Sequence, residues 1–217
     1  MAEPRTISQF KSKLAGGAAR PNLFEVSIPS FPSSVSDAWN SGDNGENGTF
    51  KFLCKAANLP ASTVAAINVP FRGRNLKVAG DKTFADWTVT VINDEDFRLR
   101  TAFEKWSNAL SKLDDNTGVT NPTSYMANGF VKQLGRGKTA EAITNKGDET
   151  SVLRTYKFYD IWPSEISAIE LSYDNTDTIE EFTVTFQVQY FTVGETDTSA
   201  TGSFDETVSD QGASTLE

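Results

Sequence analysis

The clearest hydrophobic pattern in the chain lies between Trp87 and Val91, where apolar and polar residues alternate. Trp87, Val89 and Val91 would point to one side of an extended chain, and the two threonines between them to the other. A two-residue period built from aromatic and β-branched residues is typical of a strand with one buried face. The preceding residues 75–84 also favour extended structure, with a turn expected at residues 80–81.

Immediately after this strand the hydrophobic period becomes that of a helix. Five apolar residues follow at spacings of four, three, four and three, which places them on one stripe of an α-helix. These residues are Leu99, Phe103, Trp106, Leu110 and Leu113. Asn93 or Asp94 would cap the first turn. The pattern predicts a helix over residues 94–113 that packs its stripe against a sheet, and no other stretch predicts a helix as clearly.

Shorter alternating stretches predict most of the remaining strands. They cover residues 23–28, 49–56, 130–134, 152–162 and 181–190, with Pro163 expected to end the fourth. In the last stretch, Phe182, Val184, Phe186, Val188 and Tyr190 alternate with Glu181, Thr183, Thr185, Gln187 and Gln189. Several strands with one long helix predict a mainly β subunit. We expect an antiparallel β-sandwich or barrel with the helix packed on its outside.

Residues 59–74 contain apolar side chains without a clean two-residue alternation. Because a proline cannot donate to a strand ladder, Pro60 and Pro70 place this segment at an edge or outside the sheet. One hypothesis is that it contacts a neighbouring subunit; the alternative is a satellite strand folded over its own subunit. The candidate contact residues are Leu59, Pro60, Ile67, Val69, Phe71, Arg72 and Arg74.

Composition divides the chain into three parts. Residues 1–19 form a small, polar and basic arm, and residues 20–193 form the β domain, into which the Pro-, Ser- and Gly-rich loop 29–48 is inserted. Residues 194–217 hold six acidic residues and no Lys or Arg. An extension of that composition is expected to be disordered unless an assembly orders it.

The totals exclude several function classes. The 217 residues carry a formal charge of −9, no His and one Cys, Cys54. This composition disfavours binding to nucleic-acid phosphates, removes the commonest general base and metal ligand, and allows no disulfide framework. No phosphate-loop spacing is present. We therefore expect no enzymatic activity, no cofactor, no metal and no small-molecule substrate. With no secretory signal in residues 1–20 and no long apolar run, we expect a soluble product of a reducing cytoplasm.

Several motifs occur in an order typical of one family. They are Arg20-Pro21-Asn22-Leu23-Phe24-Glu25-Val26, Cys54-Lys55-Ala56 with Leu59-Pro60-Ala61, Val78-Ala79-Gly80-Asp81-Lys82-Thr83-Phe84, Asp86-Trp87-Thr88-Val89-Thr90-Val91, Asn93-Asp94-Glu95, and Trp162-Pro163. Over about residues 20–192 the chain resembles the tail tube proteins of contractile-tailed, T-even-like bacteriophages. The arm, the loop 29–48 and the extension 194–217 depart from the familiar pattern.

The resemblance implies a function in assembly. It implies a β-barrel-like subunit that forms hexameric rings, stacked into a hollow tube inside a contractile sheath. The implied partners are other copies of the chain, the sheath protein, the baseplate and tail terminator proteins, and double-stranded DNA that passes without sequence-specific binding. The implied location is the virion tail, assembled in the cytoplasm of the host bacterium.

The polar face of the last predicted strand is the candidate lining of such a channel. Glu181, Thr183, Thr185, Gln187 and Gln189 include no positive charge, so this face would not trap a polyanion. Alternatively, the face meets outer solvent or the sheath. Two other functions stay open: the tube of a contractile secretion or injection machine that passes proteins, and a monomeric β-sandwich binding module.

Overall fold

The computed structural model describes residues 6–13, 18–32, 35, 49–138, 150–174 and 176–195. Most of the loop 29–48 and of the extension 194–217 lies outside these residues. The described helices are α1 (Ile7–Lys13), α3 (Thr49–Leu53), α4 (Arg98–Leu110) and the 3-10 turn η1 (Pro122–Ser124). The described strands are β1 (Phe24–Ser27), β2 (Cys54–Ala57), β3 (Ser62–Phe71), β4 (Arg74–Phe84), β5 (Trp87–Ile92), β6 (Ala127–Lys138), β7 (Thr150–Ile166), β8 (Glu181–Gln187) and β9 (Tyr190–Glu195).

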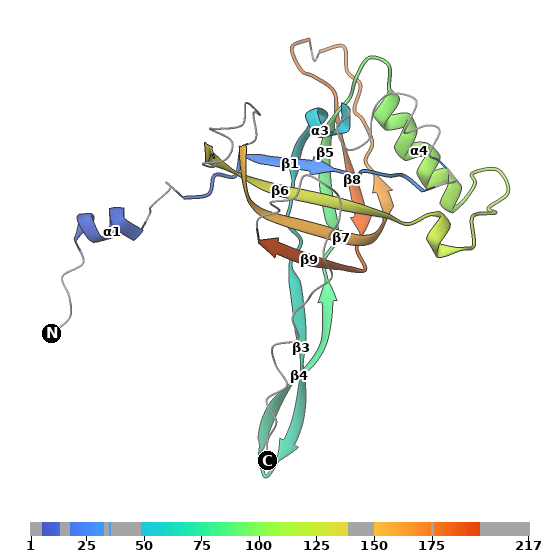
Figure 1. Cartoon of the computed structure of the whole chain (residues 1–217). Helices are drawn as coiled ribbons and strands as arrows, with labels where there is room; N and C mark the ends of the chain where they lie inside the picture. Colours follow the sequence, from blue (N-terminus) through green and yellow to red (C-terminus); the bar gives the residue numbers. More distant parts are fainter. Residues whose placement is uncertain are drawn as a thin grey trace.

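Seven strands form one antiparallel sheet in the order β1-β6-β7-β8-β5-β2, and β9 also pairs with β7. The long strand β7 belongs to both halves of this sheet, because its first part pairs with β6 and β9 and residues 162–166 pair with β8. In Figure 1, β6, β7 and β9 run across the view while β5 and β8 cross them, so the sheet folds into two layers. The predicted antiparallel, mainly β fold is confirmed.

The core lies between these layers and is rich in aromatic side chains. As the alternation predicted, Trp87, Val89 and Val91 of β5 are fully buried, opposite the core residues of β8. The Trp87 ring stacks on Phe158 of β7 with ring centroids 4.7 Å apart. Gly129 of β6 leaves room for this stack, since a Cβ there would lie 2.8 Å from the Trp87 ring.

Helix α4 covers the core, but it is shorter than the predicted 94–113. Leu99, Phe103 and Trp106 are fully buried as expected, and the Trp106 indole N–H donates to the carbonyl of Tyr125 at 2.7 Å. Leu113 is 96% exposed, so its place on the stripe was wrongly predicted. The reason is that α4 ends at Leu110, where the chain turns back. The Ala109 carbonyl accepts a hydrogen bond from the Val119 backbone N–H instead of from a further helical turn.

The start of α4 also differs from the prediction. Its N-cap residue is Phe97, whose backbone is left-handed with φ 52°, and Phe97 has no capping side chain. Asp94 instead accepts a hydrogen bond from the backbone N–H of Arg98 at 3.2 Å from within the preceding turn. The carboxylate therefore satisfies a helix donor without lying at the helix boundary.

The predicted strand 49–56 is wrong in its first half. Residues 49–53 form the helix α3, and only Cys54–Ala57 is extended. Phe50 and Cys54 are buried, as either a helix or a strand allows, but Phe52 is 76% exposed. An alternating pattern of only three apolar residues, Phe50, Phe52 and Cys54, does not distinguish a helical turn from a strand. Helices α1 and α3 also show that α4 is not the only helix.

Two predicted strand ends are wrong because of β-bulges. Strand β4 continues through residues 80–81, where Val64 pairs with Lys82 but Ala66 pairs with Ala79, so β4 accommodates one extra residue. Strand β7 continues past Pro163, which pairs with Phe186 next to another register shift. A bulge leaves a backbone position without a ladder partner, so the missing N–H of proline is tolerated there.

The last predicted strand, 181–190, is two strands. Strand β8 ends at Gln187, and β9 begins at Tyr190 and pairs with β7. Tyr190 is therefore 41% exposed rather than in the core, and its ring stacks on Tyr159 instead. Gln189 lies in the bend between the two strands.

Candidate assembly surfaces

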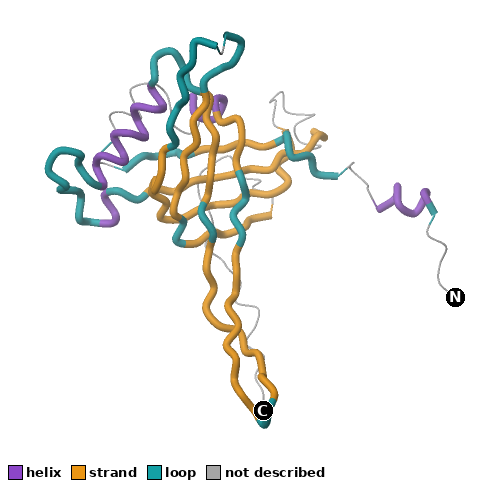
Figure 2. Tube along the Cα trace, turned by 180° about the vertical axis from the view of Figure 1, so that it is seen from behind, coloured by secondary structure: helices purple, strands orange, loops and turns teal. Residues whose placement is uncertain are grey.

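Strands β3 and β4 form a separate two-stranded sheet, which we call the hairpin (residues 62–84). Figures 1 and 2 both show it projecting from one end of the body, by which we mean the rest of the described fold from residue 18 onward. Every residue of β3 is exposed. The prediction that this segment lies outside the main sheet is confirmed, and the hairpin does not fold back over its own body.

The turn of the hairpin is set by Arg72 and Gly73. Both have positive φ, 46° and 81°, which is the signature of the type I′ turn that matches strand twist. The Arg72 guanidinium lies over the Phe71 ring, 5.5 Å from its centroid. The tip therefore presents an aromatic ring flanked by the basic residues Arg72 and Arg74.

One face of the hairpin is apolar and has no partner within the described chain. Residues directly opposite each other in an antiparallel pair share a face, and Ile67 faces Val78 while Val69 faces Leu76. Their neighbour Phe71 is 66% exposed and Leu76 is 62% exposed. Side chains that stay half or more exposed have gained little of the burial free energy available to them.

The hairpin brings together five of the seven candidate contact residues and adds two that the sequence did not single out. Ile67, Val69, Phe71, Arg72 and Arg74 belong to it, whereas Leu59 and Pro60 lie at its base. Pro60 is buried, so it is part of the body. Leu76 and Val78 were missed, although their alternation across the Arg72-Gly73 turn was a usable signal.

A second candidate surface is the polar face shared by β8 and β5. In the register of these strands Thr185 lies opposite Thr88, and Thr183 lies opposite Thr90. The hydroxyls of Thr90 and Thr183 are 3.4 Å apart, within hydrogen-bonding distance. These four threonines lie together on one face of the sheet, and we call them the hydroxyl lattice. The sequence assigned only Thr183 and Thr185 to a candidate surface.

The ends of this polar face carry little unbalanced positive charge. Lys55 of β2 forms an ion pair with Glu181, so this cation beside the lattice is neutralised by a neighbour. Gln187 continues the β8 face next to Thr185. Gln189 does not, because it lies beyond the end of β8 and donates its backbone N–H to Tyr159 of β7 at 3.3 Å.

Other chemistry is sparse in the described part of the chain. No group of three or more His, Cys, Asp and Glu residues that could hold a metal ion occurs among the described residues. Burial raises the pKa of the Cys54 thiol from 9.0 to about 12, which makes it a poor nucleophile. No helix among these residues is long and apolar enough to cross a membrane.

Comparison with known proteins assigns the family. A family model described as phage tail tube protein matches residues 19–194, which includes the whole β domain. The chain belongs to this family. The tail tube protein gp19 of Enterobacteria phage T4 is 33% identical over 177 residues, covering 82% of this chain and 93% of the relative.

Solved structures share the tail tube fold at much lower identity. The sheath–tube complex of an extracellular contractile injection system matches with a TM-score of 0.52 and 11% identity, covering 88% of this chain and 98% of that chain. The cap that terminates the tube of the anti-feeding prophage matches with a TM-score of 0.54 and 12% identity, covering 82% and 91%. At such identities the likeness concerns the fold.

Proposed function

We propose that this tail tube protein polymerises as hexameric rings, which stack into the inner tube of a contractile phage tail and conduct double-stranded DNA into the host. The observation that carries this proposal is the projecting hairpin, whose apolar face is covered by nothing in the described chain. Exposed apolar patches of this kind mark interaction surfaces, and a protein that works by assembly needs one. The 33% identity to a phage tail tube protein supports DNA as the cargo.

In this proposal the hairpin contacts a neighbouring ring. Phe71 is the most exposed apolar residue of the hairpin, so the variant Phe71→Asp should fold normally and fail to extend tubes. Purified wild-type subunits should give tubes by negative-stain electron microscopy, with six-fold end views. A protein that stays monomeric at high concentration, without rings or tubes, would instead favour the binding module.

The hydroxyl lattice of β5 and β8 lines the channel in this proposal. Repeated around a ring of six, neutral Thr88, Thr90, Thr183 and Thr185 would keep the bore wet and offer no cation to the phosphates. The variant pair Thr185→Lys with Gln187→Lys should leave tubes intact while genome delivery slows and becomes sensitive to salt. Unchanged delivery by particles with intact tubes would place this face outside the channel.

The remaining partners follow from the same proposal. We propose that the sheath protein surrounds the tube and that baseplate and terminator proteins bind its two ends, within a virion tail assembled in the bacterial cytoplasm. Solved relatives come from a sheath–tube complex, a terminating cap and a baseplate, which supports these partners. The sheath–tube complex belongs to an extracellular contractile injection system, so a protein-passing tube is the second candidate function. Packaged DNA beside these tubes in purified particles would exclude it.

A further inference from the structure

The hairpin and the end of the body farthest from it carry opposite charge. The hairpin holds four basic residues and one acidic residue: Arg72, Arg74, Lys77, Lys82 and Asp81. Residues 93–97 and 167–181, which we call the acidic end, hold eight carboxylates and no Lys or Arg. Figures 1 and 2 show the hairpin and these two loops at opposite ends of the molecule, joined by the strand β5.

The acidic end also has an apolar surface. A pocket of about 360 Å³ at this end is lined by Ile169, Leu171 and Ile179 together with polar residues, among them the carboxylates of Glu170, Glu180 and Glu181. Leu171 and Ile179 are strongly exposed although both are large and apolar. Exposed apolar side chains beside several carboxylates suit a partner that is both apolar and basic.

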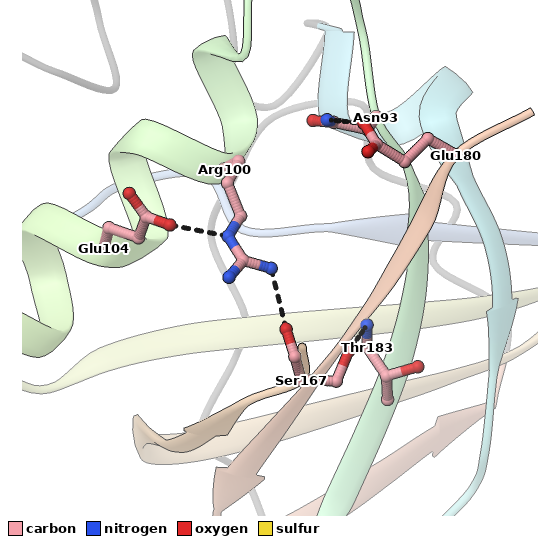
Figure 3. Close-up of polar contacts among 6 residues, drawn as sticks. All are labelled: Asn93, Arg100, Glu104, Ser167, Glu180 and Thr183. Atoms are coloured by element: carbon pink, nitrogen blue, oxygen red, sulfur yellow. Dashed lines mark hydrogen bonds and ion pairs between the residues drawn. The ribbon is translucent and has the colours of Figure 1, made fainter. Parts of the chain in front are cut away.

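Hydrogen bonds hold this pocket in place, as Figure 3 shows. The Arg100 guanidinium of α4 donates to the Ser167 carbonyl at 2.8 Å, and the Ser167 hydroxyl accepts from the Thr183 backbone N–H at 2.8 Å. The Asn93 side-chain amide donates to the Glu180 carboxylate at 2.6 Å. The loop that follows β7 is thus fixed near both of its ends, at Ser167 and at Glu180. A site that is already formed loses less conformational entropy when a partner binds.

Local cations leave part of the negative charge uncompensated. At this end, Arg98 pairs with Asp96 and Lys55 pairs with Glu181, and Arg100 pairs with Glu104 along α4. Among the described residues, no ion pair involves the exposed carboxylates Glu170, Asp174 and Asp177. Their field favours association with a basic surface and disfavours an acidic one.

The hairpin tip is the basic and apolar surface that this chain itself supplies. Arg and aromatic side chains are the commonest anchors of protein interfaces, and Arg binds carboxylates in a planar, bidentate geometry. The ten residues of β3 reach roughly 33 Å at about 3.3 Å per residue, far enough to meet a second copy beyond its own body.

We propose that the acidic end of one copy receives the hairpin tip of a second copy. Phe71 enters the pocket, and Arg72 and Arg74 meet Glu170 in the pocket lining and Asp174 farther along the same loop. This inference rests on the proposed function, because it names the receptor for the ring-to-ring contact of the tube. Since donor and receptor lie at opposite ends of one chain, the contact repeats head to tail and gives a polar filament.

A charge-exchange experiment tests the pairing. The donor variant carries Arg72→Glu and Arg74→Glu, and the receptor variant carries Glu170→Lys and Asp174→Lys. Each alone faces a like-charged partner, so sedimentable tubes should fall at least tenfold. An equimolar mixture offers opposite charges at every junction and should form tubes of alternating rings at close to the wild-type yield. Matched controls at exposed sites off both surfaces, Lys105→Glu and Asp114→Lys, should polymerise normally.

The outcomes separate this inference from the proposed function. If wild-type protein forms tubes but the mixture does not, the receptor assignment is wrong while tube formation stands. If wild-type protein forms no tubes, the proposed function fails and this inference with it.

Disulfide trapping gives a second measurement that does not depend on charge reversal. Oxidised tubes of Arg72→Cys with Glu170→Cys should run as a ladder of linked chains on a denaturing gel, because the native Cys54 is buried. The pair Arg72→Cys with Asp114→Cys should give no ladder. A ladder from the control pair, or none from the test pair in intact tubes, would overturn the proposed contact.

Discussion

The strands β4 and β5 follow each other along the chain, carry similar alternating patterns, and end up in opposite surroundings. In β5 the apolar residues Trp87, Val89 and Val91 are fully buried, while Leu76 and Val78 of β4 stay exposed. The difference lies in what covers each apolar face: in β5, Trp87 packs against Phe158 of β7 and Phe186 of β8, whereas Leu76 and Val78 of β4 lie on the projecting hairpin beside residues of β3. Alternation therefore reports that a strand has one apolar face, and the fold decides whether the same chain or another copy covers it.

The contrast also has a thermodynamic side. Burying a Val, Leu or Ile side chain contributes roughly 1.5–3 kcal/mol, and the body has gained this stabilisation on folding. An isolated two-stranded hairpin is marginally stable in water. The apolar residues of the hairpin stay exposed, so substitutions there should change folding little, and under the proposed function they should change assembly far more.

The contrast between the buried body and the exposed hairpin should be largest in the rates at which thiols at the two places react. With the pKa of Cys54 near 12, its thiolate fraction at pH 8 is about a thousandfold smaller than at the ordinary value of 9.0. The thiol introduced by Val69→Cys on the exposed hairpin should react with a small disulfide reagent at least a thousandfold faster. Absorbance kinetics on folded subunits measure both rates, and denatured wild-type protein is the control. Similar rates would mean that Cys54 is accessible.

The same pKa shift predicts a pH dependence of stability. The folded state favours the neutral thiol, so its stabilisation is complete below the unfolded pKa near 9 and is lost as pH rises towards 12. Between pH 8 and 11, wild-type protein should lose more unfolding free energy than Cys54→Ala. Parallel pH profiles of the two proteins in denaturant titrations would contradict this.

The largest loss of stability is expected at Trp106 in the body. Trp106→Ala removes a fully buried indole that packs beside Phe31 and Phe186, and it should cost about 3–5 kcal/mol of unfolding free energy. Leu113→Ala, at a site 96% exposed, should change the unfolding free energy by no more than about 0.5 kcal/mol. Urea titrations compare the two. A loss below about 1 kcal/mol at Trp106 would show that the helix stripe does not form the core.

A smaller loss is expected from overfilling the same core. The added methyl group of Gly129→Ala would lie 2.8 Å from the Trp87 ring and 3.0 Å from Ile161, which should cost about 1–3 kcal/mol. Gly194→Ala, with no atom within 4 Å of the new methyl group, is the matched control. Equal midpoints of thermal unfolding in the two variants would argue against the close Trp87 contact.

The smallest effect on the subunit is expected in the hairpin. Leu76→Ala should change the unfolding free energy of dissociated subunits by less than about 0.5 kcal/mol. The same truncation at fully buried Leu99 should cost about 2–5 kcal/mol. Leu76→Ala should nevertheless raise the protein concentration needed for tube formation, measured by sedimentation. Normal assembly by that variant would place the hairpin face outside the subunit contacts.

The sequence alone determined the elements in which one hydrophobic period extends over several residues that the fold then buries. The buried sides of β5 and β8 and the stripe Leu99, Phe103 and Trp106 were predictable, because each covers several residues with one unambiguous period. Pro70 predicted that its segment lies at an edge or outside the main sheet, although the hairpin turn at residues 72–73 was not predicted. Residues 49–53 were not predictable, because Phe50 and Cys54 fit a helical turn and a strand equally well.

Only the tertiary structure decided which strands pair and where each one ends. Bulges carry β7 past Pro163 and β4 past residues 80–81, and a bend separates Gln189 from the polar face of β8. The opposition of a basic hairpin and an acidic end was equally hidden, since residues 72 and 170 are brought to opposite ends by strand order. Pairing and spatial position depend on contacts between residues far apart in sequence, and a local pattern carries no information about those contacts.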